Sequence, residues 1–202
     1  MKLAYDPDRR EWPSWLSALG IDSALLPEVF APGTVIATVD NTIAQQLGLP
    51  PDCQVVAGTT DSIAAFIATG AGEVGEAVTS LGSTLVLKLV SDKPVFASEL
   101  GVYSHRLGET WLAGGASNSG GRVLLKYFNQ AQLDEMTPKL DADTDTGLHY
   151  YPLVEAGERF PRNDPQLQPL LDPRPDNDVK FFQAMLEGMA AIEAEGYQAL
   201  VQ

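Results

Sequence analysis

Residues 55–67 read VVAGTTDSIAAFI, and this stretch predicts a strand, a sharp turn and a helix with one carboxylate at their junction. The β-branched Val55 and Val56 are typical of the end of a buried strand, and Gly58 lets the backbone turn. The apolar run from Ile63 then favours a helix. Because α/β folds commonly place their chemistry at strand ends, the stretch draws attention to Asp61.

Asp61 has two possible roles at this junction. Its carboxylate could accept the proton of a substrate hydroxyl as a general base. It could equally be the N-cap of the helix that follows, because Asp is strongly preferred at that position. From these residues alone, the general enrichment of Asp at N-caps favours the second role.

The composition is that of an ordinary soluble globular protein. The chain has 202 residues, of which 45% are hydrophobic and 20% charged, enough for a hydrophobic core and one or two domains. The charge sum is 13 − 27 = −14 without any basic block, which argues against a nucleic-acid partner. Cys53 is the single cysteine, so a reducing cytoplasm fits best. Neither a signal peptide nor a membrane-spanning apolar run is evident, so no membrane partner is expected.

Helical and strand patterns alternate along the chain, which favours an α/β or α+β fold. A long apolar stripe predicts that the final helix faces the core, with Met185 and Met189 as packing residues. The predicted helices are 12–20, 41–47 and 179–201. A turn leading into a strand is predicted over 31–39, and a meander of short strands over 77–81, 85–90, 102–106 and 110–113. Residues 141–145 and 156–178 are expected to be irregular and to wrap over the surface.

Residues 70–75 read GAGEVG, which is too rich in glycine for the interior of a helix or strand. A domain junction or hinge is one interpretation of this segment. A tight surface loop is the other.

Two glycine-centred motifs point to an anion. Gly82-Ser83-Thr84 lies in a turn between strands, where N–H groups and hydroxyls could hold an anion, although a plain hairpin turn is the simpler interpretation. The strand that starts at Trp111 is expected to end in a glycine-rich loop over 114–121, which opens a helix over 122–128. Free N–H groups at such a helix start usually face phosphate.

Other common sites are not favoured by the sequence. The two glycine motifs match neither the dinucleotide-binding pattern nor the P-loop. His105 and His149 are isolated from one another, so a histidine triad or a zinc site is not expected.

Several longer motifs together resemble the FGGY carbohydrate kinases, and within them the xylulokinase-like and D-ribulose kinase branch. The main ones are VVAGTTDSIAAF (55–66), TSLGSTLVLK (79–88), GVYSHRLG (101–108) and WLAGGASNSGG (111–121). Shorter ones are LHYYPL (148–153), GERFP (157–161) and LEGMA (186–190). Together they cover nearly the whole chain.

The resemblance implies an α/β, actin-like (ribonuclease H-like) kinase fold in which sugar and ATP meet between two domains. The part present would be incomplete. Residues 1–71 would be the C-terminal part of the sugar-binding domain, 72–76 a hinge, and 77–202 the first part of the nucleotide-binding domain.

The resemblance also implies roles for single residues. It makes Asp61 the catalytic base and a contact of the sugar, which reverses the preference for a cap. The nucleotide contacts that it implies are Gly82, Ser83, Thr84, Gly114 and Asn118. ATP and Mg²⁺ are the implied cofactors, and no residue of the chain is assigned as a metal ligand.

Two departures from the family pattern limit this expectation. Family members begin with an Asp-x-Gly-Thr hairpin, which is absent before Asp61, and they carry a Gly-Gly-Gly-x-x-Asn motif after the helix that here ends near Gln202. The sequence therefore predicts an internal piece of a cytoplasmic, ATP-dependent kinase for a ketose such as D-ribulose or D-xylulose, inactive by itself. A non-catalytic binding or scaffold module is the alternative, and the oligomeric state stays open.

Overall fold

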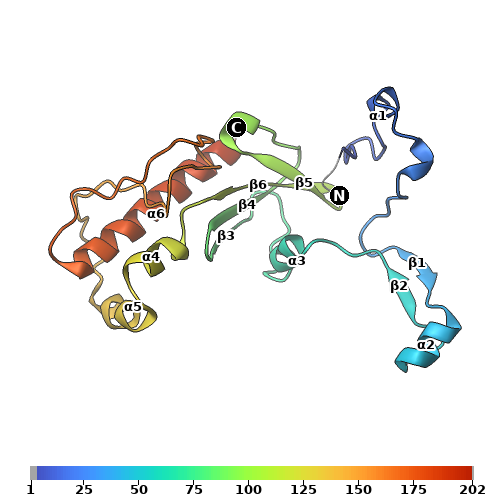
Figure 1. Ribbon diagram of the computed structural model, residues 1–202, viewed down its shortest axis with the longest axis horizontal. Helices are drawn as coiled ribbons and strands as arrows, with labels where there is room; N and C mark the ends of the chain where they lie inside the picture. Colours follow the sequence, from blue (N-terminus) through green and yellow to red (C-terminus); the bar gives the residue numbers. More distant parts are fainter. Residues whose placement is uncertain (1–3, 202) are drawn as a thin grey trace. The chain divides into compact units, whose positions relative to one another are not determined.

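The chain divides between Gly70 and Ala71 into two parts, each with its own helices and strands (Figure 1). The computed structural model describes residues 4–201. Gly70 has a φ of +83°, a left-handed conformation that glycine adopts without strain. The division lies at the start of the glycine-rich segment. The hinge at 72–76, and the assignment of 1–71 and 77–202 to a sugar-binding and a nucleotide-binding domain, stay predictions.

The first part pairs two antiparallel strands and adds short helices. Its elements are α1 (Trp15–Ala18), η1 (Ser23–Leu25), β1 (Val35–Thr38), α2 (Asn41–Leu47), β2 (Gln54–Val56) and α3 (Asp61–Ile67). The bounds of α2 are as predicted because both of its ends are set locally. Asp40 accepts hydrogen bonds from the N–H groups of Thr42 and Ile43 at 2.8 and 3.3 Å, and Gly48 ends the helix with a φ of +66°.

The prediction that Val55 and Val56 end a buried strand is wrong. They lie in β2 as expected, but their side chains are 42% and 49% exposed. The physical reason is the size of the sheet, because β2 pairs with β1 alone and no second layer of the first part covers these side chains. The buried apolar side chains of the first part are few: Leu16, Ala44, Ile63 and Phe66.

A four-stranded antiparallel sheet organises the second part. Its strands are β3 (Ala77–Leu81), β4 (Leu85–Ser91), β5 (Tyr103–Leu107) and β6 (Thr110–Ser117), in the order β3-β4-β6-β5. The predicted meander is therefore wrong. Residues 92–102, which include η2 (Ser98–Leu100), connect β4 to β5 without pairing these two strands. Instead, β6 lies between them and pairs with both.

β6 continues to Ser117, so the predicted glycine-rich loop over 114–121 is too long by several residues. Gly114 and Gly115 are strand residues because their neighbours leave no room for a side chain. A Cβ at Gly114 would lie 2.7 Å from the Leu87 carbonyl oxygen, and one at Gly115 would lie 2.2 Å from the ring of Phe160. Glycine at these positions reflects close packing in the sheet and not a turn.

One long helix, α6 (Asp178–Leu200), packs on this sheet, and its apolar side faces the core as predicted (Figure 1). Shorter helices pack against the N-terminal half of α6. Phe160, from the irregular stretch, is 1% exposed and packs in one cluster with Leu87 and Ile192. A second cluster joins α6 to α4 (Gly121–Tyr127) and α5 (Gln130–Met136), and the short η3 (Thr137–Lys139) follows α5. Met185 and Met189 are buried at 0% and 3% exposure, which confirms their packing role.

Candidate phosphate-binding site

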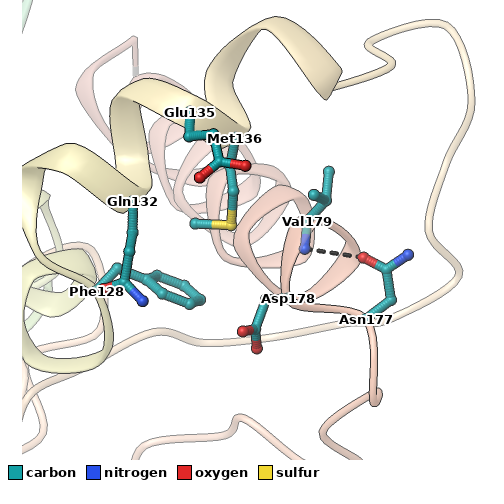
Figure 2. Close-up of a pocket in the computed structure, with 7 residues that line it drawn as sticks. All are labelled: Phe128, Gln132, Glu135, Met136, Asn177, Asp178 and Val179. Atoms are coloured by element: carbon teal, nitrogen blue, oxygen red, sulfur yellow. Dashed lines mark hydrogen bonds between the residues drawn. The ribbon is translucent and has the colours of Figure 1, made fainter.

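One cavity of the second part, between α5 and the start of α6, is unsuited to an anion. It has a volume of about 240 Å³ and is lined by Phe128, Gln132, Glu135, Met136, Asn177, Asp178 and Val179 (Figure 2). Figure 2 also shows the hydrogen bond from the Val179 N–H to Asn177 Oδ1, at 2.9 Å, which caps α6. A hydrogen bond from Lys139, together with its charge, lowers the pKa of Glu135 and keeps it charged. Asp178 is likewise paired, with Arg174 at 2.9 Å, and none of the lining residues is a cation that could receive phosphate.

A smaller cavity, called the Ser83 cavity below, brings together three of the predicted nucleotide contacts. It has a volume of about 120 Å³, and its lining residues are Ser83, Thr84, Asn118, Arg122, Val154, Glu155, Ala156 and Gly157. They come from the β3–β4 turn, the β6–α4 junction and the loop that follows Leu153. Ser83, Thr84 and Asn118 thus meet in one place, although they lie far apart in the sequence.

The β3–β4 turn supplies hydrogen-bond donors to this cavity. The Gly82 N–H closes the turn on the Thr84 carbonyl oxygen at 3.1 Å. Within residues 4–201, the N–H groups and the hydroxyls of Ser83 and Thr84 have no acceptor in the structure. Backbone N–H groups and hydroxyls left open at a turn form an anion-binding concavity.

The start of α4 is already occupied by this turn. Gly121 donates its N–H to the Gly82 carbonyl oxygen at 2.8 Å, and Arg122 donates its N–H to the Ser83 carbonyl oxygen at 3.4 Å. The expectation that the N–H groups opening this helix are free for phosphate is therefore wrong for these two. Gly120 has a φ of +144°, and a Cβ there would lie 2.8 Å from the backbone of Thr84, so the close approach requires glycine.

Two of the predicted nucleotide contacts do not line the Ser83 cavity. Gly114 lies inside β6, opposite Lys88 of β4 and Tyr103 of β5, and the geometry gives it a packing role. Gly82 contributes its carbonyl oxygen to α4 and so shapes the turn without lining the cavity.

Arg122 was missed by the sequence reasoning and is the cation of this cavity. Its side chain is exposed, and no carboxylate lies within 4.0 Å of it in the described part of the chain. A signal for it was present in the sequence, because a cation at the start of a helix opposes the helix dipole. A positive charge in that unfavourable place, beside a suspected phosphate motif, indicates a ligand-binding role.

The loop across the cavity is held to β6 by hydrogen bonds. The Asn118 side-chain Nδ2 donates to the Gly157 carbonyl oxygen at 2.9 Å. Glu158, only 2% exposed, accepts the Asn118 backbone N–H at 2.6 Å and the Tyr151 hydroxyl at 3.0 Å. Burial, and then the charge of Glu158, raises the pKa of Tyr151, so that its hydroxyl keeps the proton that it donates.

Asp61 is the first residue of α3, and the N-cap is Thr60. The interpretation of Asp61 as the cap is therefore wrong, because the chain is still extended at Thr60, with φ −77° and ψ 154°, and turns helical one residue later. Asp61 Oδ1 accepts the Ser62 N–H at 2.7 Å, and the side chain is exposed. A carboxylate in the first turn is favoured by the helix dipole and stays accessible to a ligand.

The described residues offer no ready-made metal centre. No group of three or more His, Cys, Asp or Glu side chains within 4–201 is placed to hold an ion. Glu155 is the one carboxylate among the residues that line the Ser83 cavity.

No helix between residues 4 and 201 is long and apolar enough to cross a membrane.

Comparison with known proteins relates the chain to sugar kinases. No family model matches it. It is 27% identical over 177 residues to the xylulose kinase of Staphylococcus epidermidis, covering 82% of the chain and 35% of that protein. It is 26% identical over 200 residues to the xylulose kinase of Klebsiella pneumoniae, covering 95% of the chain and 41% of that protein.

A solved structure shows the fold of the chain. The crystal structure of ligand-bound xylulose kinase from Lactobacillus acidophilus superposes with a TM-score of 0.82 at 19% identity, over 98% of the chain and 42% of that structure. The chain thus spans about two-fifths of the proteins that it resembles. These similarities confirm the predicted resemblance to carbohydrate kinases: the chain is similar to xylulose kinases in sequence, and it shares their fold over the part that it spans.

Proposed function

We propose that the complete protein containing this chain is an ATP-dependent kinase for a small sugar. The observation that carries this proposal is the Ser83 cavity, in which Ser83, Thr84 and Arg122 present donors and a positive charge, in a chain related to xylulose kinases. The cavity suits one phosphate group in size and charge. We assign it to the phosphates of ATP.

Asp61 is the proposed general base. As a sugar hydroxyl oxygen attacks the γ-phosphorus, its proton passes to the Asp61 carboxylate, and the bond from the γ-phosphorus to the β-phosphate bridging oxygen breaks to release ADP. The exposed position of Asp61 at the start of α3 supports this role, because a base must reach its substrate. The reaction needs no covalent intermediate.

The Ser83 cavity would act by electrostatic stabilisation. The N–H groups of Ser83 and Thr84 are held by the turn and can offset negative charge without reorganising during the reaction, and the Arg122 guanidinium adds a positive charge. Mg²⁺ would arrive with ATP and neutralise charge on its phosphates. Glu155 is the candidate protein ligand, because Mg²⁺ in such sites is held by one or two carboxylates plus phosphates.

Ketoses of the D-xylulose and D-ribulose type are the substrates we favour. The support is that the two relatives described above, from Staphylococcus epidermidis and Klebsiella pneumoniae, are xylulose kinases. The test is transfer of labelled γ-phosphate from ATP to a panel of ketoses, polyols and sugar acids by the complete protein. Transfer to a ketose supports the proposal, and transfer to none of them, or labelling only of water, contradicts it.

A second candidate is a non-catalytic nucleotide-binding module. Its support is the Ser83 cavity, whose donors could hold the phosphates of a nucleotide without any transfer of phosphate. Titration calorimetry of the 202-residue chain with ATP, ADP and adenosine tests nucleotide binding, which both candidates predict, and phosphate transfer by the complete protein separates them. Nucleotide binding by a complete protein that transfers no phosphate would favour the module.

A further inference from the structure

We propose that Glu158 is the positioning residue of the Ser83 cavity, holding Asn118 and the loop 154–157 in the arrangement that receives phosphate. This inference rests on the proposed function. Glu158 belongs to the GERFP motif, to which the sequence reasoning gave no role. The side chain does not line the cavity itself and acts through its neighbours.

The carboxylate of Glu158 is buried without a cationic partner. It is 2% exposed, and no Lys, Arg or His side chain within the described residues lies within 4.0 Å of it. Four hydrogen bonds compensate for the lost water. Glu158 Oε1 accepts the N–H groups of Asn118 and Arg159 at 2.6 and 2.8 Å, and Oε2 accepts the hydroxyls of Ser117 and Tyr151 at 2.6 and 3.0 Å.

This set of donors matches a carboxylate and no other side chain of that size. A carboxylate accepts at both oxygens, whereas the amide of Gln accepts at one only. Burying a charge is costly, and packed apolar side chains often serve stability as well or better. The presence of a carboxylate with four donors is therefore explained better by the positions in which it holds Asn118 and the loop 154–157 than by a contribution to the stability of the fold.

The hydrogen bonds of Glu158 converge on the residue that lines the cavity. Asn118 is held twice, through its backbone N–H on Glu158 and through its side-chain Nδ2 on the Gly157 carbonyl oxygen. Ser117, which donates to Glu158, accepts the Ser119 N–H at 3.0 Å. The carboxylate thus holds Ser117 directly, and Ser119 through the hydroxyl of Ser117.

The opposite wall of the cavity is connected to the same network. The Ser119 carbonyl oxygen accepts the N–H of Leu85 at 2.7 Å, and Leu85 directly follows Thr84. The backbone of Glu158 is itself anchored, because it exchanges hydrogen bonds with Asp164 at 2.8 and 3.0 Å. Glu158 therefore links the β3–β4 turn, Asn118 and the loop into one rigid unit.

The test compares Glu158→Gln with Glu195→Gln. Glu195 pairs with Arg162 at 2.8 Å on the surface and does not line the cavity, so its variant loses a contact of the same irregular stretch without touching Asn118. Binding of ATP to the 202-residue chain is measured by calorimetry, folding by thermal unfolding, and the amide signals of Asn118 and Arg159 by NMR. In the complete protein, KM is measured for ATP and for the sugar.

We expect Glu158→Gln to weaken ATP binding roughly 10- to 100-fold, the loss of one hydrogen bond to a charged group. KM for ATP should rise while KM for sugar stays unchanged, and the Asn118 and Arg159 amide signals should move. Glu195→Gln should keep wild-type ATP affinity. A folded Glu158→Gln variant with wild-type ATP affinity would overturn the inference.

Two further outcomes are decisive. If Glu158→Gln does not fold, Ser117→Ala takes its place, since it removes one donor from Glu158 and the acceptor of the Ser119 N–H. Weaker ATP binding by Ser117→Ala supports the inference, and unchanged binding overturns it. If the wild-type chain and the complete protein both fail to bind ATP, the proposed function itself is wrong, a result distinct from unaltered binding by the variants.

Discussion

The backbone N–H of Gly121 donates a hydrogen bond to the carbonyl oxygen of Gly82 at 2.8 Å, so the β3–β4 turn is seated on the start of α4. The N–H of Arg122 adds a second bond, to the Ser83 carbonyl oxygen. The two carbonyl groups face the helix. The turn's remaining donors, the N–H groups of Ser83 and Thr84, are left without a protein acceptor among residues 4–201.

Gly120→Ala should disturb this seating. A Cβ at Gly120 would lie 2.8 Å from backbone atoms of Thr84, which cannot move without moving the turn. We expect ATP affinity to fall by about tenfold or more, equal to about 1.4 kcal/mol, in calorimetric titration of the 202-residue chain. Thermal unfolding should show a loss of about 1–3 kcal/mol from backbone strain and displacement.

Gly147→Ala is the matched control for that substitution. Gly147 has a φ of +72°, and a Cβ there meets no atom within 4 Å, so alanine brings strain without a clash. We expect lower stability with unchanged ATP affinity. Equal affinities of the Gly120 and Gly147 variants would contradict the role given to the turn.

Arg122→Gln should weaken binding of phosphate-bearing ligands specifically. Loss of a hydrogen bond to a charged group costs about 1.5–3 kcal/mol, so ATP and ADP affinity should fall roughly 10- to 100-fold, whereas adenosine affinity should not change. The salt dependence of ATP binding should also become shallower. Lys180→Gln, which removes an exposed cation of α6, is the control, and a similar loss of ATP affinity in both variants would point to general charge effects.

Hydrogen bonds to the Glu76 carboxylate hold the segment 72–76 in a pH-dependent way. Its Oε2 accepts the N–H groups of Gly72 and Glu73 at 2.7 and 2.9 Å, and these bonds lower its pKa below the ordinary value of 4.5. Because the folded pKa is below the unfolded one, the stabilisation is full above pH 4.5 and is lost as the pH falls through the folded pKa. Protection factors of the Gly72 and Glu73 amides against hydrogen exchange should therefore decrease on acidification below pH 4.5.

In a Glu76→Gln variant the protection factors of the same amides should depend little on pH, because the titrating acceptor is gone. Glu73→Gln keeps the acceptor and should behave as the wild type. If the protection factors of the Gly72 and Glu73 amides in the wild type do not change between pH 6 and pH 3, about three tenfold steps in proton concentration, Glu76 is excluded as the group that holds this segment.

Local signals account for the elements that the sequence predicted well. α2 begins after Asp40 and ends at Gly48, and both ends are set by neighbouring residues. The apolar stripe of α6 likewise needs no distant information. Strand order does, because the pairing of β4 with β6 depends on contacts between residues far apart in the chain.

The glycines of β6 show why the extent of the glycine-rich loop was predicted wrongly. Gly114 looks like a loop residue in the sequence, yet it is required by the Leu87 carbonyl oxygen on the neighbouring strand. Glu158 lies in an irregular, proline-rich stretch, so no periodicity reveals that its side chain is buried. The sequence could single out Ser83, Thr84 and Asn118 as candidate contacts. That they line one cavity together with Arg122 depends on the pairing of β4 with β6, which the sequence does not reveal.

The central claim, that Asp61 acts as the base of a sugar kinase, is tested most directly by kcat for transfer of the ATP γ-phosphate to a ketose in the complete protein and its Asp61→Asn variant. A general base contributes roughly 10²–10⁴-fold, so kcat should fall by about that factor while ATP affinity stays unchanged. Asp52→Asn, an exposed turn carboxylate in the first part, should retain wild-type kcat. An Asp61→Asn protein that transfers phosphate at the wild-type rate would contradict the claim.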